Sequence, residues 1–361
     1  MCLKKKKTRR ARDLLYITSY PMNYFQKSEN LYNSAVLNNG AGISESEMRE
    51  VAEWPLDQAM SLFAAADRVR RDFFGGAVDP CAIMSVKSGG CGEDCAFCSQ
   101  SAHNLADVAV HGLCPTEEIV SRCREAWSRG LPFCVVSSGR RLNAAEFQTL
   151  CEALSECGGG GEKHASLGIL GESDFAALRD AGVVCYNHNL ETSRGYFGKI
   201  VTTHGYDDRV ATVRRAKAAG LRVCCGGIFG VGESWDDRIE LCLELRGLGV
   251  DTVPINFLNA IEGTRVEPPK EPPLEFLKIV SLYRLAMPMS TIKVCGGREK
   301  NLGALQPLIF LAGANGYITG GYLTTGGAGL EADDGMIGAL GLSRKNQNQN
   351  QNQNLKNTMG K

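Results

Sequence analysis

Residues 81–104, "CAIMSVKSGGCGEDCAFCSQSAHN", join a short apolar run to a loop that holds three cysteines. The run 81–86 has the length and the composition of a buried β-strand. Cys91, Cys95 and Cys98 follow it closely. Because a closed structural metal site takes four protein ligands, three thiols predict a metal centre with one coordination position left open.

Short apolar runs like the first recur along the chain, at residues 81–86, 133–137, 164–169, 183–187, 222–228, 252–257, 291–295 and 316–320. Most are separated by stretches of helical periodicity, as in 207–220, where Val210, Val213 and Ala216 fall on one face. This alternation predicts an α/β fold with a parallel sheet, and eight repeats predict a single-domain (β/α)8 barrel of the TIM type. A doubly wound open sheet is the alternative.

The composition is that of an ordinary globular protein, with 361 residues, 43% hydrophobic and 22% charged. The formal net charge is +0, so no overall field favours nucleic acid or an anionic membrane, and we expect neither as a partner. No apolar run approaches the roughly 18 residues that a membrane-spanning helix needs. The 15 cysteines follow no secretory signal, which predicts reduced thiols, metal ligation and a cytoplasmic location.

Both ends of the chain differ in composition from the part between them. The start, "MCLKKKKTRRARDLL", carries seven cationic side chains. We predict a poorly ordered basic and polar extension over residues 1–45, with a targeting peptide or a nucleic-acid arm as the alternatives. The barrel is expected over residues 46–342. Residues 343–361 are rich in Asn and Gln, which predicts a flexible low-complexity tail.

The three-cysteine loop follows the first predicted strand, at the end of a barrel where active sites lie. Gly89, Gly90 and Gly92 allow the backbone to wrap closely around an inorganic group. Four thiolates normally hold a [4Fe–4S] cluster, so three would leave one iron open to a small molecule. Catalytic zinc also takes three protein ligands and is the alternative.

The spacing C-x3-C-x2-C after a first barrel strand resembles the radical S-adenosylmethionine (SAM) superfamily. The resemblance implies that Cys91, Cys95 and Cys98 hold a [4Fe–4S] cluster whose open iron binds SAM. It also implies that Phe97 lies against the adenine. In that superfamily, an electron from the cluster splits SAM and yields a 5′-deoxyadenosyl radical.

Four further segments resemble the biotin synthase family: "YNHNLETS" (186–193), "VPINFLNAIEGT" (253–264), "GGREKNL" (296–302) and "AGANGYITGGYLTT" (312–325). The resemblance runs from about residue 55 to 342. It implies a sulfurtransferase that closes the thiophane ring of biotin by inserting sulfur into dethiobiotin. It also implies a flavodoxin or ferredoxin as electron donor, and a homodimer.

The ureido group of dethiobiotin has two N–H donors and one carbonyl acceptor, which an asparagine amide complements. The resemblance implies that Asn187 and Asn256 hold this group and that Asn189 contacts both the substrate and SAM. These three asparagines are the expected catalytic set.

The resemblance also assigns groups to the two ends of the ligands. Glu191 would hold the ribose hydroxyls of SAM, at a position where the family usually has Asp. Thr324 and Thr325 match the hydroxyls that bind the substrate carboxylate.

The resemblance departs at a second cluster. Biotin synthases of the familiar type hold a [2Fe–2S] sulfur donor with three cysteines and an arginine. Cys134 and Cys224 match two of these ligands, but His164 and Lys293 stand at the other two positions. Histidine is a known ligand of [2Fe–2S] iron, whereas lysine replaces arginine poorly. A packed core histidine is the alternative for His164.

Strand alternation offers replacement ligands for this auxiliary cluster. Cys185 lies two residues before Asn187, and Cys295 two residues after Lys293, so each pair should share an inward face. We predict an auxiliary cluster of altered ligation or type, bound by Cys134 and Cys224 with help from Cys295 or Cys185.

Two other functions are compatible with the sequence. A related radical enzyme with one cluster, such as an isomerase, lyase or maturase, would have lost the sulfur donor. A protein that is not an enzyme, stabilised by an iron–sulfur cluster or by zinc, would not respond to SAM.

Overall fold

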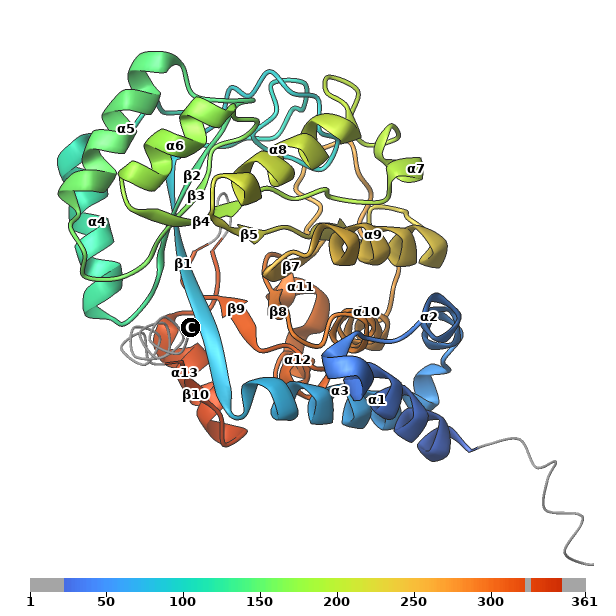
Figure 1. The fold of residues 1–361 in the computed structure, drawn as a ribbon. Helices are drawn as coiled ribbons and strands as arrows, with labels where there is room; N and C mark the ends of the chain where they lie inside the picture. The colour runs from blue at the N-terminus through green and yellow to red at the C-terminus, as the bar shows by residue number, and fades with distance from the viewer. Residues whose placement is uncertain (1–22, 322–325, 346–361) are drawn as a thin grey trace, which may run out of the picture.

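The computed structural model describes residues 23–321 and 326–345 of the chain. Its parallel strands form a closed barrel, in the order β1, β2, β3, β4, β5, β7, β8 and β9 (Figure 1). The barrel closes because β1 pairs with β9 as well as with β2. The predicted (β/α)8 fold is therefore confirmed, and the open-sheet alternative is wrong.

The strands are β1 (Ala77–Lys87), β2 (Phe133–Ser137), β3 (Lys163–Ser166), β4 (Val183–Asn187), β5 (Arg222–Cys224), β6 (Gly227–Phe229), β7 (Thr252–Phe257), β8 (Thr291–Val294), β9 (Gly316–Ile318) and β10 (Ser343–Arg344). Each of the eight predicted runs contributes to the barrel. The run 222–228 is divided into β5 and β6, and both parts pair with β7.

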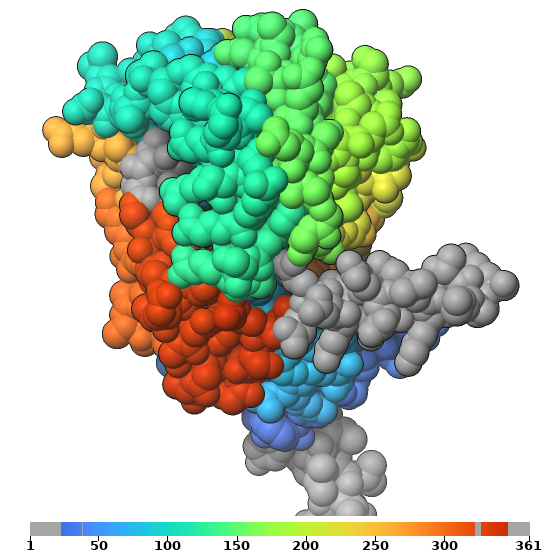
Figure 2. All heavy atoms as spheres, turned by 90° about the vertical axis from the view of Figure 1, so that its left-hand side faces the viewer, coloured from blue at the N-terminus to red at the C-terminus, as the bar shows by residue number. Residues whose placement is uncertain are grey.

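The helices are α1 (Tyr24–Gly40), α2 (Glu45–Ala52), α3 (Ala59–Phe74), α4 (Thr116–Ser128), α5 (Ala144–Glu156), α6 (Glu172–Asp180), α7 (Arg194–Phe197), α8 (Tyr206–Ala218), α9 (Trp235–Leu248), α10 (Pro273–Ala286), α11 (Arg298–Leu302), α12 (Leu308–Leu311) and α13 (Leu330–Ala339). Two short 3₁₀ helices are η1 (Leu56–Gln58) and η2 (Gly303–Leu305). The helices that follow the strands surround the barrel, and α4, α5 and α13 cover one side of it (Figure 2).

Residue alternation along the strands separates two environments. Val135, Ala165 and Tyr186 are fully buried among the apolar residues of the main core. The residues immediately before them, Cys134, His164 and Cys185, line a cavity inside the barrel. Because successive side chains of a strand point to opposite faces, the outer set packs on the helices and the inner set is available for chemistry.

The segment before the barrel is more ordered than the predicted extension over residues 1–45. Helix α1 begins with a capping box at Asn23 and Gln26, and Leu31 and Ala35 are buried. It packs against α3 and α10. The basic composition of the first residues does not extend into α1. The apolar residues of α1 are buried against α3 and α10. Residues 1–22 lie outside the described part of the chain.

The end of the chain also differs from the expectation that a tail begins at residue 343. Ser343 and Arg344 form β10, which pairs with β1 through Ala77 and Val78. The Arg344 guanidinium Nε lies 3.1 Å from Asp334 Oδ1 of α13. Residues 346–361 lie outside the described part. No helix within the described ranges is long and apolar enough to cross a membrane.

Candidate active site

One cavity of about 450 Å³ occupies the barrel and opens at the carboxyl ends of its strands. It brings together nearly all of the residues that the sequence singled out: Cys91, Cys95, Phe97, Cys98, Cys134, His164, Cys185, Asn187, Asn189, Glu191, Cys224, Asn256, Lys293 and Cys295. Thr324 and Thr325, the expected carboxylate ligands, lie outside the described residues. The expected catalytic and cofactor positions therefore share one cavity.

The three-cysteine loop is folded by hydrogen bonds within the loop, from both side-chain and backbone donors. Asn104 Nδ2 donates to the carbonyl oxygens of Cys95 at 3.1 Å and Cys98 at 2.8 Å. The backbone amide of Cys91 donates to the Gln100 carbonyl at 3.0 Å. Gly89 has a φ of 71°, a left-handed value that glycine adopts without strain. These contacts fix the three thiols at one end of the cavity.

A second set of contacts anchors this loop to the barrel. The Asp94 carboxylate accepts hydrogen bonds from the backbone amides of Thr202 at 2.8 Å and Thr203 at 3.1 Å. Arg265 Nε donates to Asn104 Oδ1 at 3.0 Å and so supports the residue that shapes the loop. The loop is thereby anchored to two other segments, one at Thr202 and Thr203 and the other at Arg265.

The segment after β4 carries three polar residues into the cavity. Asn187 Nδ2 lies 3.2 Å from Cys224 Sγ, and Asn189 Oδ1 accepts from the Gly226 amide at 3.3 Å. Glu191 has a φ of 71°, an uncommon value for a residue with a side chain. Its backbone oxygen accepts from the Ile228 amide at 2.8 Å, which holds the segment against β6.

Arg209 of α8 supports this segment from behind. Its Nη1 donates to the Asn189 carbonyl at 2.7 Å and to Glu191 Oε1 at 3.3 Å. Burial raises the pKa of Glu191 above its ordinary value, although the positive charge of Arg209 opposes this effect. The carboxylate is thus a half-buried acceptor beside the Arg209 guanidinium.

Asn256 lies across the cavity on β7. Its Nδ2 donates to the Gly227 carbonyl at 3.2 Å, and its Oδ1 accepts from the Gly296 amide at 3.1 Å. These bonds fix the plane of the amide. An asparagine amide has two donor hydrogens and two acceptor lone pairs, so further hydrogen-bonding capacity remains.

The inner end of the cavity is formed by side chains from neighbouring strands. In the strand register, Cys134 pairs with His164, and His164 pairs with Cys185. Cys224 pairs with Asn187. Cys295 lines the cavity together with Lys293, as alternation predicts, whereas Cys225 is fully buried in the apolar core. The candidate auxiliary ligands therefore face one space.

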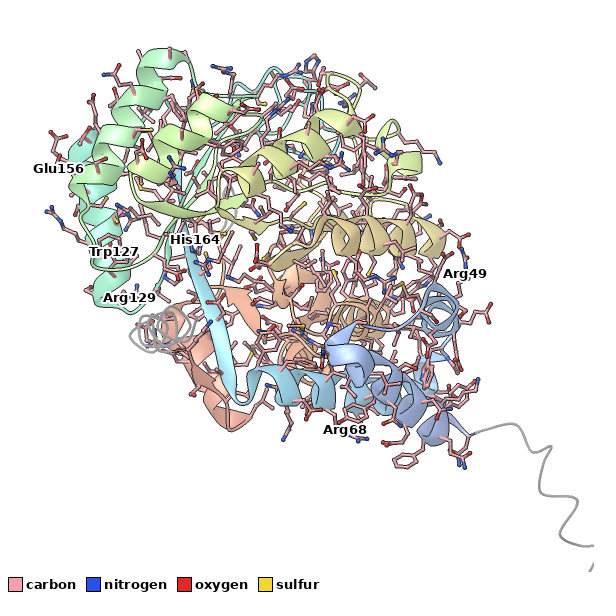
Figure 3. All side chains as sticks on the ribbon, in the orientation of Figure 1. Arg49, Arg68, Trp127, Arg129, Glu156 and His164 are labelled. Carbon is pink, nitrogen blue, oxygen red and sulfur yellow. The ribbon has the colours of Figure 1, made fainter. Side chains whose placement is uncertain are left out.

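The two residues that replace the family's ligands each have a charged neighbour. His164 Nε2 lies 3.0 Å from Glu162 Oε2, and Arg222 donates to the same carboxylate at 2.5 Å. Lys293 Nζ lies 3.2 Å from Asp79 Oδ2. His164, which is labelled in Figure 3, belongs to β3 and lines the cavity. It is therefore a cavity histidine with a polar partner, not one packed in the apolar core.

Sequence reasoning missed Cys81, which begins the first predicted run. It lines the cavity and is 6% exposed. Its thiol forms hydrogen-bonding contacts with Cys134 and His164. The available signal was alternation, because Cys81 and Ile83 share the inward face of β1. Treating the run as uniformly apolar concealed this thiol.

The donor set of the cavity fits iron–sulfur clusters. All cysteines in the described part of the chain are free thiols. Burial raises the pKa of Cys95 to about 12 and that of Cys224 to about 11, so these thiols ionise only beside a strong positive charge such as iron. No three His, Cys, Asp or Glu side chains of the described residues are grouped to hold a single metal ion.

Two family models match the chain. The model of the "Radical SAM superfamily" matches residues 85–245, which include the three-cysteine loop. The model of the "Biotin and Thiamin Synthesis associated domain" matches residues 254–343. Together they span the barrel from β1 to β10 and include both ends of the cavity.

Curated relatives are similar over most of the chain. A biotin synthase of Desulfatibacillum aliphaticivorans is 48% identical over 301 residues, which cover 82% of this chain and 92% of the relative. A biotin synthase of Geobacter sulfurreducens is 45% identical over 320 residues, which cover 87% of this chain and 97% of the relative.

Solved structures share the fold at low sequence identity. The crystal structure of methylornithine synthase (PylB) has a TM-score of 0.77 at 19% identity, and the match covers 90% of this chain and 99% of that one. A structure of HydG, a maturase of the [FeFe]-hydrogenase, has a TM-score of 0.69 at 15% identity, covering 82% of this chain and 68% of that one. At these identities the likeness concerns the fold alone.

Proposed function

The chain belongs to the biotin synthase family of radical SAM sulfurtransferases, and we propose how its own cavity residues divide the reaction. The enzyme inserts sulfur into dethiobiotin to form biotin, with a [4Fe–4S] cluster, SAM and an auxiliary iron–sulfur cluster as cofactors. The observation that carries the proposal is the single cavity, which holds the three-cysteine loop, the asparagines and the inner thiols together.

When bound, the [4Fe–4S] cluster supplies the electron that cleaves SAM, and the auxiliary cluster supplies the sulfur. We assign Cys91, Cys95 and Cys98 as ligands of the first cluster. Phe97 offers an apolar ring to the adenine, and Glu191 offers its carboxylate to the ribose hydroxyls. The support of Glu191 by Arg209 at 3.3 Å keeps that acceptor in position.

The asparagines orient dethiobiotin. Asn187 and Asn256 present amide groups to the ureido ring, which has the complementary donors and acceptor. Asn189 stands between Asn187 and Glu191 along the segment, so it is placed to contact both ligands. On the basis of the sequence resemblance, we assign Thr324 and Thr325 to bind the substrate carboxylate.

The barrel contributes position and the exclusion of water. A primary carbon radical reacts with almost any C–H bond, so selectivity depends on which bond is held within contact distance. The cavity walls supply this control, while the cofactors carry the difficult chemistry. The inner thiols belong to the barrel strands, whereas the three-cysteine loop follows the carboxyl end of β1, and both line the same cavity.

The auxiliary cluster is assigned to Cys134 and Cys224, with His164, Lys293, Cys185 and Cys295 as the further candidates. Cys134 and Cys224 are the two positions that match the family. The remaining candidates line the same end of the cavity.

The family also implies partners. We propose that a flavodoxin or ferredoxin delivers the electron and that the protein is a homodimer in the cytoplasm. The free thiols of the described residues are in keeping with a reducing compartment.

The test uses anaerobically reconstituted protein. Iron and sulfide per chain are measured, and products are analysed after addition of dithionite, SAM and dethiobiotin. We expect more than about four irons per chain, with biotin and 5′-deoxyadenosine as products. About four irons, with 5′-deoxyadenosine and no biotin, would instead favour an enzyme without a sulfur donor.

A double variant, Cys134→Ala with Cys224→Ala, locates the auxiliary cluster. We expect it to lose the additional iron and sulfide while it still cleaves SAM. Unchanged iron and sulfide in this variant would refute the assignment of these two cysteines.

A further inference from the structure

We propose that Cys81 is a thiolate ligand of the auxiliary cluster and takes the place of a ligand lost at position 164 or 293. The proposal rests on the proposed function, because it requires an auxiliary cluster at the inner end of the cavity. The sequence resemblance gives Cys81 no role. The assignment arises from where β1 brings its side chain.

Cys81 lies among the residues already assigned to the cluster. It is 6% exposed, lines the cavity and pairs in register with Ile318 of β9. Its thiol makes hydrogen-bonding contacts with Cys134 and His164, and it interacts electrostatically with Lys293. Cys81 therefore contacts one matched ligand position, Cys134, and one altered position, His164, and it lies near the charge of the other altered position, Lys293.

The two altered residues have other partners that limit them as ligands. Lys293 Nζ is 3.2 Å from the Asp79 carboxylate, and an ammonium has no lone pair with which to bind iron. His164 Nε2 is 3.0 Å from Glu162, which leaves its other ring nitrogen for the cavity. At least one ligand must therefore come from elsewhere.

Two thiols in contact suit one iron. With Fe–S bonds near the roughly 2.3 Å of a metal–thiolate bond, two ligands on a tetrahedral metal have sulfurs about 3.8 Å apart. The Cys81 thiol is hydrogen-bonded to the Cys134 thiol, so the two sulfurs are neighbours inside the cavity. Each thiol would lose its proton to solvent as its sulfur bonds to iron.

Charge balance also favours Cys81 in this chain. A thiolate in place of a neutral ligand adds one negative charge to a buried cluster. Lys293, which is 5% exposed, supplies a positive charge at the same end of the cavity. The negative charge of the added thiolate is thus offset by the positive charge of Lys293, which stands where the family has its arginine ligand.

The competing thiols are less well placed. The Cys295 thiol donates to the carbonyl of Lys293 at 3.5 Å. Cys185 is the register partner of His164 on β4, which lies two strands further from β1 than the β2 strand of Cys134. Cys81, in contrast, is hydrogen-bonded to the assigned ligand Cys134.

The test is Cys81→Ala in anaerobically reconstituted enzyme, with iron, sulfide, visible absorption and Mössbauer spectra as readouts. We expect iron to fall to about four per chain, with loss of the auxiliary-cluster signals. SAM cleavage to 5′-deoxyadenosine should persist. Cys81→Ser, which keeps the side-chain size, should give a changed auxiliary spectrum and guards against a simple packing effect.

Cys242→Ala is the matched control, because Cys242 is buried in α9 and does not line the cavity. It should retain the full iron and sulfide content. Full content and an unchanged spectrum in Cys81→Ala would overturn the proposal and leave the proposed function intact. Only about four irons in the unaltered enzyme would overturn both.

Discussion

Lys293 and Asp79 form an ion pair across one strand of the barrel, with Nζ 3.2 Å from Oδ2. Both residues are register partners of Gly316 on β9, which lies between β8 and β1. A Cβ atom at Gly316 would stand 3.0 Å from Lys293 Cε. The absence of a side chain at this position allows the lysine to reach over β9 to the carboxylate.

Removal of Asp79 should expose the cost of a buried ammonium. Burial alone would lower the pKa of Lys293, but Asp79 and the neighbouring thiols raise it above its ordinary value. Because the loss of one partner leaves the other charge buried, we expect Asp79→Asn to lower the free energy of unfolding by about 3 kcal/mol. Urea unfolding under anaerobic conditions measures this change. The double variant with Lys293→Met should recover part of the loss, and equal losses in both would contradict the pairing.

The capping carboxylate of α9 should make stability depend on pH. Burial raises the pKa of Asp237, but hydrogen bonds from Ser193 and Ser234 outweigh it and hold the pKa below the ordinary 3.8. A lowered pKa stabilises the fold above the unfolded value, and this stabilisation is lost as pH falls through the folded value. The stability advantage of the unaltered chain over Asp237→Asn should therefore be constant near pH 6 and shrink below about pH 4.

The control for that comparison is Asp57→Asn, at an exposed residue of η1. The difference in urea midpoint between Asp57→Asn and the unaltered chain should be the same at every pH. A pH-independent difference for Asp237→Asn as well would show that its effect comes from packing alone.

Glu191 should act on SAM and not on dethiobiotin. A hydrogen bond to a charged group contributes about 1.5–3 kcal/mol, so Glu191→Ala should weaken SAM binding by about 10- to 100-fold. Glu191→Asp should retain most of the affinity, because Asp tolerates the positive φ of 71° at this position. Equilibrium binding of SAM to the reconstituted enzyme provides the measurement. Equal affinities for Ala and Glu at this position would rule out the assigned contact.

Asn187 should act on dethiobiotin. Loss of one hydrogen bond of about 1.4 kcal/mol in Asn187→Ala predicts a tenfold rise in KM for dethiobiotin, with a smaller change for SAM. Asn143→Ser is a suitable control, because Asn143 caps α5 and does not line the cavity. A similar rise in both KM values would show that Asn187 acts by shaping the cavity as a whole.

The periodicity of the sequence predicted the barrel because its signal is local. Alternating apolar runs and helical stretches state which segments become strands, and the closed parallel sheet follows from their number and order. The spacing of Cys91, Cys95 and Cys98 likewise lies within one loop. The face-sharing of Cys185 with Asn187, and of Cys295 with Lys293, followed from the two-residue period of a strand.

Only the tertiary structure decided which distant side chains meet. Cys81 and Cys134 come into contact because β1 and β2 are adjacent and their register places both thiols inward. Lys293 and Asp79 are far apart in the chain and are joined across Gly316. Helix α1 is ordered because its buried residues pack against α3 and α10. Each of these contacts depends on strand register and on packing between distant segments, which the local pattern of residues does not specify.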